Sequence, residues 1–393
     1  MTIPKVPLGE FVEIKGGGTP SKSNAAFWGG NIPWVSPKDM KTWEICDSED
    51  KITAEAVRES ATNLIPPNAT LIVNRSGILK HTLPVGITRR PVAINQDIKA
   101  ILVSPRAHPE YVAHIIKAAE PIVLKWVRAT TADNFPIDNL RELEIPLPPL
   151  DEQRRIAAIL DKADALRRKR KRTIELIECL MQATYRRMFV EQASNSWPKC
   201  TVASLARDIR TGPFGSQLLH SEFVDEGIAV LGIDNVATNE FRWGERRHIP
   251  EEKYEKLRRY TVFPGDVLIT IMGTCGRCAI VPENIPLAIN TKHLCCITLD
   301  EEKCLPEFLQ STFLQHPDVL LQLGVQAKGA VMPGLNMGII KSLQISLPPV
   351  QLQRDFVMRI SKLRSTLISS RHWEAEGELL FSSLQHRAFS GQL

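Results

Sequence analysis

The residues of this chain that could do chemistry gather in loops rich in glycine, hydroxyl and basic side chains. Residues 15–24 read Lys-Gly-Gly-Gly-Thr-Pro-Ser-Lys-Ser-Asn, and Trp28 and Trp34 follow them. Glycine lets a backbone approach a phosphate closely, while Lys, Ser and Thr contact phosphates or base edges. The Walker pattern Gly-x4-Gly-Lys-Ser/Thr is absent, which argues against a nucleotide site. The composition of 15–24 favours contact with DNA over an ordinary surface loop.

Two further loops each follow a run of β-branched residues. Segment 74–80 carries Arg75, and segment 272–277 carries Arg277. Arginine is the side chain that most often makes a bidentate contact with guanine in the major groove. Both residues are equally compatible with ordinary turn arginines. The complete set of candidate DNA-contacting residues is Lys15, Thr19, Ser21, Lys22, Trp34, Lys38, Arg75, Ser76, Lys80, Arg210, Ser216, Gln217, Asn235, Arg246, Arg277 and Lys292.

Catalytic patterns are weak in this sequence. Glu251 and Lys253 match the Glu-x-Lys half of a metal-dependent nuclease site, but no Pro-Asp precedes them at suitable spacing. The chain has no Gly-x-Ser-x-Gly, no His-Glu-x2-His and no Asn/Asp-Pro-Pro-aromatic tetrapeptide of an amino-methyltransferase. We therefore expect a non-catalytic chain, with a solitary nuclease as the catalytic alternative.

A zinc site is the metal alternative. The pairs Cys275/Cys278 and Cys295/Cys296 approximate a ligand set, but a zinc ribbon requires Cys-x2-Cys twice and the second pair is adjacent. The eight cysteines are too sparse for a disulfide scaffold and are expected to be reduced thiols. No metal or cofactor site is predicted.

The segments that must position these loops occur twice in the chain as an internal sequence repeat. Ile145-Pro-Leu-Pro-Pro-Leu150 recurs as Ile345-Ser-Leu-Pro-Pro-Val350, at an offset of 200. Upstream blocks pair at offsets of 197 and 195, with 93–95 and 288–290 both reading Ala-Ile-Asn. Blocks in the same order at nearly constant offset predict a tandem duplication.

Each copy has two parts of different character. Short runs such as 70–73, 267–271 and 100–103 lie between Gly, Pro and Asn clusters, which is typical of strands and turns. The predicted short helices are 54–63, 251–260, 109–119 and 306–314. The fold class is therefore α+β.

A long helix is expected after each Pro-Pro pair, because proline is tolerated only at a helix start. In the first copy the predicted apolar stripe is Ile156, Ile159, Leu160, Ala163, Leu166, Ile174, Ile177, Leu180, Met181 and Met188. In the second copy it is Phe356, Ile360, Leu363, Leu367, Leu379, Leu380, Ser383 and Leu384, with Gly377 as a weak point. Such stripes are too long for one small domain to cover, so the two helices are expected to pack antiparallel as a coiled coil.

The domain organisation follows from this division. The predicted segments are a globular domain at 1–144, a helical spacer at 145–195, a second globular domain at 196–344 and a second spacer at 345–393. The product is a pseudo-twofold molecule, and double-stranded DNA is a ligand whose half-sites mirror such symmetry.

Charge and hydropathy give further information on the kind of partner and the cellular location of the protein. The net charge of +5 is mild, but residues 151–190 hold 11 Lys/Arg against 6 Asp/Glu, a local +5. The run Arg167-Arg-Lys-Arg-Lys-Arg172 is either a phosphate-binding surface or a solvated helix face, and the second copy lacks it. No apolar run approaches a membrane span, and the first residues lack a leader pattern, so a cytoplasmic protein without membrane contact is expected.

Several motifs resemble the specificity subunits of type I restriction-modification enzymes, and the resemblance covers nearly the whole chain. It rests on 145–154 leading into Ile159-Leu-Asp-Lys-Ala-Asp-Ala-Leu-Arg-Arg168, and on the ending Leu384-Gln-His-Arg-Ala-Phe-Ser-Gly391. Gly17-Gly-Thr-Pro-Ser21 and Gly212-Pro-Phe-Gly-Ser-Gln217 add to it.

This resemblance implies two target-recognition domains, each reading half of an interrupted DNA sequence. It also implies that the helices set the spacing and dock two methyltransferase subunits. S-adenosylmethionine, ATP and Mg would be used by those subunits and by a restriction subunit that translocates DNA, with no cofactor on this chain. The candidate subunit-docking residues are Asp151, Glu152, Gln153, Arg154, Gln353 and Arg354.

Alternatives remain at this point. A specificity subunit could serve an orphan methylation system or a fused nuclease-methyltransferase. The chain could instead be a coiled-coil scaffold that contacts only protein. The second copy has Gln351 and Leu352 where the first has Asp151 and Glu152, so the two docking surfaces are expected to differ in strength.

Overall fold

The computed structural model divides the chain into two compact units. The described residues are 3–129, 132–193, 196–324 and 334–393. The first unit comprises Met1–Arg172 with Arg371–Leu393, and the second is Thr173–Ser370. Each long helix is thus shared between the units, whereas the sequence placed each helix in a segment of its own.

The first unit is built from short strands and a few short helices. Its strands are β1 (Lys5–Pro7), β2 (Val12–Gly16), β3 (Trp28–Val35), β4 (Glu44–Ile45), β5 (Lys51–Ile52), β6 (Leu64–Ile65), β7 (Thr70–Val73), β8 (Val85–Thr88), β9 (Val92–Ile94), β10 (Ile98–Val103) and β11 (Glu144–Pro146). Its short helices are α1 (Ala54–Glu59), α2 (Pro109–Ala118), α3 (Glu120–Val123) and α4 (Ile137–Arg141). The long helices are α5 (Leu150–Arg186), which continues as a π-helical turn over Arg187–Glu191, and α11 (Val350–Ser390).

The second unit repeats this order. Its strands are β12 (Lys199–Thr201), β13 (Ala206–Thr211), β14 (Ile228–Leu231), β15 (His248–Ile249), β16 (Thr261–Val262), β17 (Val267–Thr270), β18 (Cys278–Ile280), β19 (Ala288–Asn290), β20 (Leu294–Leu299) and β21 (Gln344–Ser346). Its short helices are α6 (Val202–Leu205), α7 (Glu251–Leu257), α8 (Pro306–Gln315), α9 (Pro317–Gln322) and α10 (Met337–Ser342).

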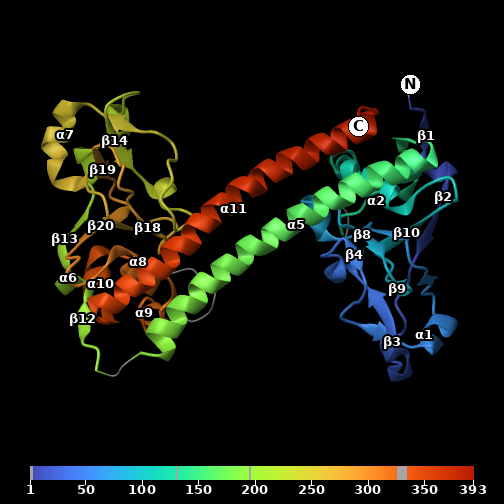
Figure 1. Ribbon diagram of the computed structural model, residues 1–393, viewed down its shortest axis with the longest axis horizontal. Coiled ribbons are helices and arrows are strands. Elements are labelled where there is room, and N and C mark those ends of the chain that lie inside the picture. The colour runs from blue at the N-terminus through green and yellow to red at the C-terminus, as the bar shows by residue number, and fades with distance from the viewer. Residues whose placement is uncertain (1–2, 130–131, 194–195, 325–333) are drawn as a thin grey trace. The chain divides into compact units, whose positions relative to one another are not determined.

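The sheets of the two units match strand by strand. In the first unit one sheet has the order β2-β10-β7-β8-β4, of which the edge strand β4 has no counterpart in the second unit, and another has the order β5-β3-β9-β6. In the second unit the orders are β13-β20-β17-β18 and β15-β14-β19-β16. Strand pairs β1-β11 and β12-β21 close each domain beside its long helix (Figure 1). The α+β class and the internal repeat are confirmed.

Two of the three predicted strands, β7 and β17, have fully buried side chains, whereas Leu102 and Val103 of β10 are only partly buried. All four residues of β7 are buried between β10 and β8, and all four of β17 are buried in the equivalent place. A strand covered on both faces is apolar throughout rather than alternating, which is why 70–73 and 267–271 stood out in the sequence.

The first predicted short helix is too long. Helix α1 ends at Glu59 rather than Asn63. The chain must leave the helix because the Thr62 hydroxyl donates to the Ile94 carbonyl at 3.3 Å. The backbone of Ala61 also lies against Gly18, where a Cβ would come within 2.8 Å.

Both long helices begin after the Pro-Pro pair, and a buried glutamine fixes each start. Gln153 is fully buried; its Oε1 accepts from the His108 amide at 2.8 Å, and its Nε2 donates to the carbonyls of Arg106 (3.1 Å) and Pro148 (2.8 Å). Gln353 makes the same three bonds in the second unit, to the Leu305 amide and to the carbonyls of Lys303 and Pro348. The prediction that these two glutamines dock a subunit is therefore wrong, because their side chains are used inside the fold.

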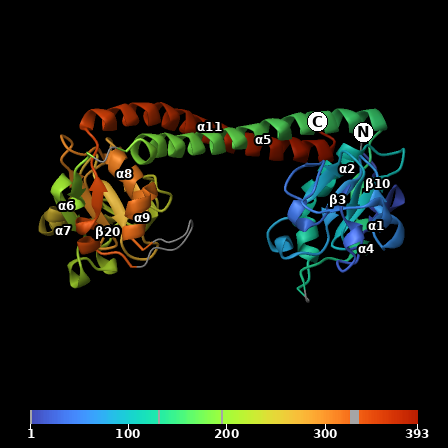
Figure 2. The same cartoon turned by 90° about the horizontal axis from the view of Figure 1, so that it is seen from below.

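In the first unit α5 and α11 run antiparallel. Arg155 donates to the Leu393 carbonyl at 2.7 Å, Arg167 pairs with Glu378 at 3.0 Å, and Arg170 donates to the Trp373 carbonyl at 2.8 Å. Figures 1 and 2 both show the two helices side by side in this unit.

The apolar stripe of α11 keeps a spacing of three and four residues along its whole length, whereas the predicted stripe departed from it after Gly377. Phe381 and Ala388 are buried, whereas Leu379 and Leu380 are 74% and 60% exposed. Steps of three and four residues from Phe356 reach Gly377 and then Phe381. The prediction instead resumed the stripe at Leu379, two residues too early. Leu166 of α5 is likewise exposed. Helix α11 continues unbroken through the predicted weak point.

Gly377 lies against the end of the Arg170 side chain of α5. A Cβ there would lie 2.9 Å from Nη1 of Arg170. Together with the ion pair of Arg167, this contact places part of the basic run between the helices. The run is therefore not simply a solvated face, and at least two of its arginines hold α5 against α11.

The antiparallel pairing recurs in the second unit. Ile174 and Ile177 of α5 pack against Leu367 of α11. Further along, the rings of Tyr185 and Phe356 are 5.8 Å apart, edge to face. Leu180, predicted on the stripe, is 52% exposed. In the described part of the chain no helix is long and apolar enough to cross a membrane.

Candidate nucleic-acid interface

The glycine-rich loops lie together with three other loops in each unit. In the second unit Gly212 follows β13 and presses on the residues after β19, where a Cβ would come within 2.0 Å of the Asn290 carbonyl oxygen. Gly273, after β17, lies against Ile233, after β14, at a Cβ distance of 3.1 Å. The two pairs are joined by hydrogen bonds from the Thr291 amide to the Leu231 carbonyl and from the Ile271 amide to the His293 carbonyl, both at 2.9 Å. The loops that follow β13, β14, β17 and β19 therefore converge.

The first unit has the same convergence at the equivalent strands, because the Asn95 amide donates to the Val35 carbonyl at the end of β3 and the Asn74 amide after β7 donates to the Asp97 carbonyl. A Cβ at Gly17, after β2, would come within 2.0 Å of the Ile94 carbonyl oxygen at the end of β9. The Gly18 amide donates to the same carbonyl at 3.0 Å. The backbone reaches this position only because residue 17 has no side chain, which explains the repeated glycine.

Arg75, predicted as a DNA contact, lies on this surface of the first unit. Its Nε donates to Oδ1 of Asp97 at 2.6 Å, and its side chain is half exposed. Asp97 follows β9 and is itself held by Asn95. Nearby, the Thr19 hydroxyl donates to Gln96 at 2.6 Å. The structure thus brings Thr19 and Arg75 to the loop after β9.

Two basic side chains, Lys292 and Arg247, lie near His293 on the corresponding surface of the second unit. Burial lowers the pKa of His293 from its usual value, and the neighbouring charges of Lys292 and Arg247 lower it further. Arg247 is paired with Asp234. These shifts favour the neutral form of His293, so attraction for the phosphates of a nucleic acid would come from Lys292 and Arg247.

An aromatic loop lies next along the chain. The rings of Phe241 and Trp243 meet edge to face at 5.4 Å, and Trp243 is 44% exposed. The guanidinium of Arg246, a predicted contact, lies 6.0 Å from the Trp243 ring. Exposed aromatic and arginine side chains together can stack on bases or pack along a groove.

Three predicted DNA contacts have internal roles instead. Arg210 is buried; it pairs with Asp266 at 2.8 Å and also donates to the Thr261 carbonyl. Asn235 is 2% exposed and binds backbone within its own loop. Trp34 is buried, with its indole N–H bound to the Gly18 carbonyl at 3.0 Å. These predictions are corrected, since the donors that would read DNA are already satisfied inside the fold.

The remaining candidates lie at or near the surface with lighter restraints. Lys22, Ser216 and Arg277 are exposed, Lys15 pairs with Glu13, and Ser21 with Ser23. Lys38 is exposed and is held by Asp50, a hydrogen bond that raises the Lys38 pKa. Ser76 accepts from the Ile78 amide, Lys80 lies 3.8 Å from Asp133, and Gln217 accepts from Tyr260.

Sequence reasoning missed Asp97, Gln96, Arg247 and His293. The signal that could have found three of them is the repeated Ala-Ile-Asn block, because Gln96, Asp97 and His293 lie in the loops that follow it. Nothing in the sequence around Arg247 identifies it as a surface residue of these loops, because its position depends on the pairing with Asp234 in the loop after β14.

The alternatives of metal binding and nuclease chemistry gain no support. Among the described residues no group of three or more His, Cys, Asp or Glu side chains could hold a metal ion. Burial raises the pKa of the Cys295 thiol to about 12, which disfavours the thiolate that binds zinc. Lys253 is paired with Glu222 at 2.6 Å on the surface of α7, not with a second carboxylate in a cleft.

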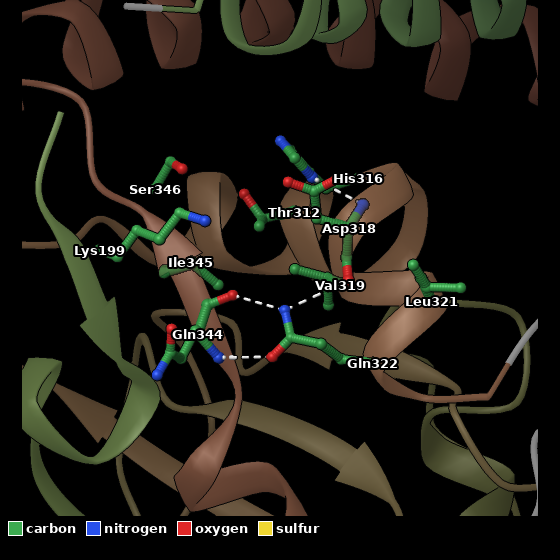
Figure 3. A pocket seen from close by; sticks show the side chains of 10 residues that line it. All are labelled: Lys199, Thr312, His316, Asp318, Val319, Leu321, Gln322, Gln344, Ile345 and Ser346. Atoms are coloured by element: carbon green, nitrogen blue, oxygen red, sulfur yellow. Dashed lines mark hydrogen bonds between the residues drawn. The ribbon is translucent and has the colours of Figure 1, made fainter. Parts of the chain in front are cut away.

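The second unit also holds a cavity of about 370 Å³ beside α9 and the strand pair β12-β21 (Figure 3). Gln322 and Gln344 exchange two hydrogen bonds of 2.8 Å within it. Lys199 is the one lysine or arginine among the lining residues. None of the lining residues comes from the four converging loops, so this cavity is separate from the candidate interface.

Comparison with known proteins gives consistent results. A family model described as the type I restriction modification DNA specificity domain matches residues 3–176 and 233–376. The specificity subunit of the type I restriction enzyme EcoR124I/EcoR124II of Escherichia coli is 43% identical over 162 residues, 40% of each chain. The MjaIX specificity subunit of Methanocaldococcus jannaschii is 30% identical over 184 residues, 46% of this chain and 42% of that protein. The chain thus matches about two fifths of the length of these two relatives.

Longer matches are more distant. The MjaVIII specificity subunit of M. jannaschii is 20% identical over 407 residues, 99% of this chain and 92% of that protein. A crystal structure of a type I restriction-modification S subunit from M. genitalium has a TM-score of 0.62 at 15% identity, covering 99% of this chain and 96% of that one. This similarity supports the shared fold.

Proposed function

Because the chain belongs to the type I restriction modification DNA specificity family, we propose that each of its two globular domains reads one half of an interrupted double-stranded DNA target. The observation that carries this proposal is the repeated convergence of four loops at equivalent strands. In both units the glycine after the second strand of the domain lies against the last residue of β9 or β19. A duplicated surface suits a ligand with two half-sites.

The helices have the features of a docking surface for methyltransferase subunits. Leu166, Leu379 and Leu380 present large apolar side chains to solvent in the first unit. Asp151 is almost fully exposed and pairs with its neighbour Arg154 at 3.1 Å, while Glu152 pairs with Arg155. Exposed apolar residues rimmed by charge are typical of protein interfaces. Two methyltransferase subunits and a restriction subunit would complete the assembly.

In this proposal the chain chooses the sequence and performs no chemistry. S-adenosylmethionine, ATP and Mg would belong to the partner subunits, and a cytoplasmic location follows from that assembly. An orphan or fused methylation system would use the chain in the same way, so neighbouring genes distinguish these cases. A protein-only scaffold would bind no DNA.

The test is co-expression of the chain with its neighbouring methyltransferase subunit, followed by single-molecule sequencing to map adenine methylation across the host genome. We expect a two-part motif with a fixed gap of about half a helical turn or more. Binding of the purified complex to DNA that carries this motif should weaken as salt rises, because phosphate contacts release counterions. A complex that forms but methylates no interrupted motif would refute DNA reading by the two domains.

Docking has a separate test. Charge reversal at Asp151 and Glu152 is expected to weaken assembly with the methyltransferase more than the same substitutions at Gln351 and Leu352. Reconstitution measured by size-exclusion chromatography checks this, with Lys362→Ala as an exposed control on the second helix. Equal losses from the two pairs would remove the predicted asymmetry.

A further inference from the structure

The strongest unassigned feature is a three-residue chain of hydrogen bonds in the first unit, from Asn95 through Asp97 to Arg75. Asn95 is 5% exposed, and its Nδ2 donates to Oδ2 of Asp97 at 3.0 Å. Its Oδ1 accepts from the Asp97 amide at 3.1 Å. The other carboxylate oxygen, Oδ1, accepts from Nε of Arg75 at 2.6 Å. A buried amide therefore orients a carboxylate, which orients an exposed arginine.

The backbone around this chain is fixed as well. The amides of Asn74 and Arg75 both donate to the Asp97 carbonyl, at 2.8 and 3.2 Å. Asn74 also ties the loop to the Phe135 carbonyl through its side chain at 2.7 Å. Little conformational freedom is left for Arg75 to lose on binding, so its contact with a ligand would cost little entropy.

The terminal nitrogens of the Arg75 guanidinium indicate which ligand groups it could bind. Asp97 occupies the Nε side, which leaves the two terminal nitrogens pointing away from the carboxylate. In the described part of the chain no residue accepts a hydrogen bond from these nitrogens. Two parallel N–H groups match the O6 and N7 acceptors of guanine in the major groove.

We propose that Asp97 positions Arg75 to read the guanine of one G·C pair in the half-site bound by the first domain. This inference rests on the proposed function and deepens it. Asp97 acts through Arg75 and is a positioning residue, while Asn95 holds Asp97 in place.

The second domain lacks this device. The strand registers align Ile98 with Leu294 and Val73 with Thr270, so Arg75 corresponds to Met272 and Asp97 to His293. The amide of Asn74 donates to the Asp97 carbonyl, and the equivalent amide of Ile271 donates to the His293 carbonyl. Met272 is 40% exposed and cannot donate a hydrogen bond to guanine. The two copies keep the same backbone arrangement but present different groups there. The arginine-carboxylate pair therefore contributes specificity to one half-site only.

The test uses the complex of the full chain with its methyltransferase subunit and the same methylome readout. The variants are Arg75→Lys, Asp97→Ala and Asp97→Asn, the last keeping the shape of the side chain. Lys80→Ala is the matched control, since it removes one positive charge from the same loop at a side chain that is 64% exposed.

We expect the wild-type motif to require a G·C pair at one position of one half-site. All three variants should admit other base pairs there, with discrimination falling on the order of tenfold. The other half-site should be unchanged. Lys80→Ala should lower methylation of all targets alike, because a phosphate contact carries no sequence information.

Three results would overturn the inference. One is a wild-type motif without a required G·C pair in either half. The second is unchanged discrimination in Arg75→Lys and both Asp97 variants. The third is a uniform loss of methylation that matches Lys80→Ala. A wild-type complex that methylates no interrupted motif would instead refute the proposed function itself, which keeps the two failures distinct.

Discussion

Replacement of Gln153 by alanine should destabilise the first unit far more than its place among surface charges suggests. The substitution removes three hydrogen bonds and leaves the His108 amide and two carbonyls without their partner in a fully buried position. An unsatisfied buried group costs about 1–3 kcal/mol, and water entering the space left by the side chain offsets part of that sum. We expect a loss of about 3 kcal/mol in the free energy of unfolding of the first unit.

The second unit provides a matched experiment. Gln353→Ala removes the equivalent three bonds, including the one from the Leu305 amide at 2.9 Å. Hydrogen exchange distinguishes the units: Gln153→Ala should speed exchange at His108, and Gln353→Ala at Leu305. A 3 kcal/mol loss corresponds to about a hundredfold faster exchange through local opening. Because these sites share no partner, the losses should add in the double variant.

Urea denaturation followed by circular dichroism gives the total effect. Arg154→Ala is the control, because its exposed side chain pairs only with Asp151 and should change stability by less than about 0.5 kcal/mol. If Gln153→Ala behaves like this control, or speeds exchange in both units equally, the assignment of the glutamine as a local structural clamp is refuted.

Two further predictions concern the thiols and the helix contact. At pH 8 the exposed Cys46 and Cys179 should react rapidly with a disulfide reagent, whereas Cys295 should react only on unfolding, because burial raises its pKa to about 12 and suppresses the thiolate. The same shift predicts that stability falls as pH rises above the unfolded thiol pKa of about 8.5, since only the unfolded state releases the proton easily. Rapid labelling of Cys295 in the native protein would contradict both statements. Gly377→Ala should stabilise an Arg170→Ala background by up to about 1 kcal/mol through helix propensity, but less in the wild type, where the new Cβ would lie 2.9 Å from the guanidinium. Equal effects in the two backgrounds, measured by thermal unfolding, would show that the glycine and the arginine are not coupled.

Local chemistry made much of the fold predictable. Proline restricts where a helix can start, so the Pro-Pro pairs located both long helices. Runs of β-branched residues located β7 and β17, because strands buried on both faces need apolar side chains throughout. The repeated blocks identified the duplication, and equivalent residues do occupy equivalent elements in the two units.

The sequence could not show which polar side chains are used internally. Arginine and glutamine are also common in surface contacts, so the residue types of Arg210 and Gln153 do not show where their hydrogen bonds are made. Only the neighbours packed around them show that these hydrogen bonds lie inside the fold. The sequence also did not show which residues of α11 beyond Gly377 face α5. Two exposed leucines look as apolar as the buried Phe381, and the choice between them depends on where α5 lies.

The sequence by itself determined the duplication, the α+β class, the starts of the helices and the residue types of the candidate loops, because these depend on short-range preferences and on similarity along the chain. Only the tertiary structure decided which side chains of those loops face solvent and which carboxylate orients Arg75. Asp97 is 22 residues away from Arg75 in the chain, and its role exists only because β7 and β9 deliver their following loops to the same place.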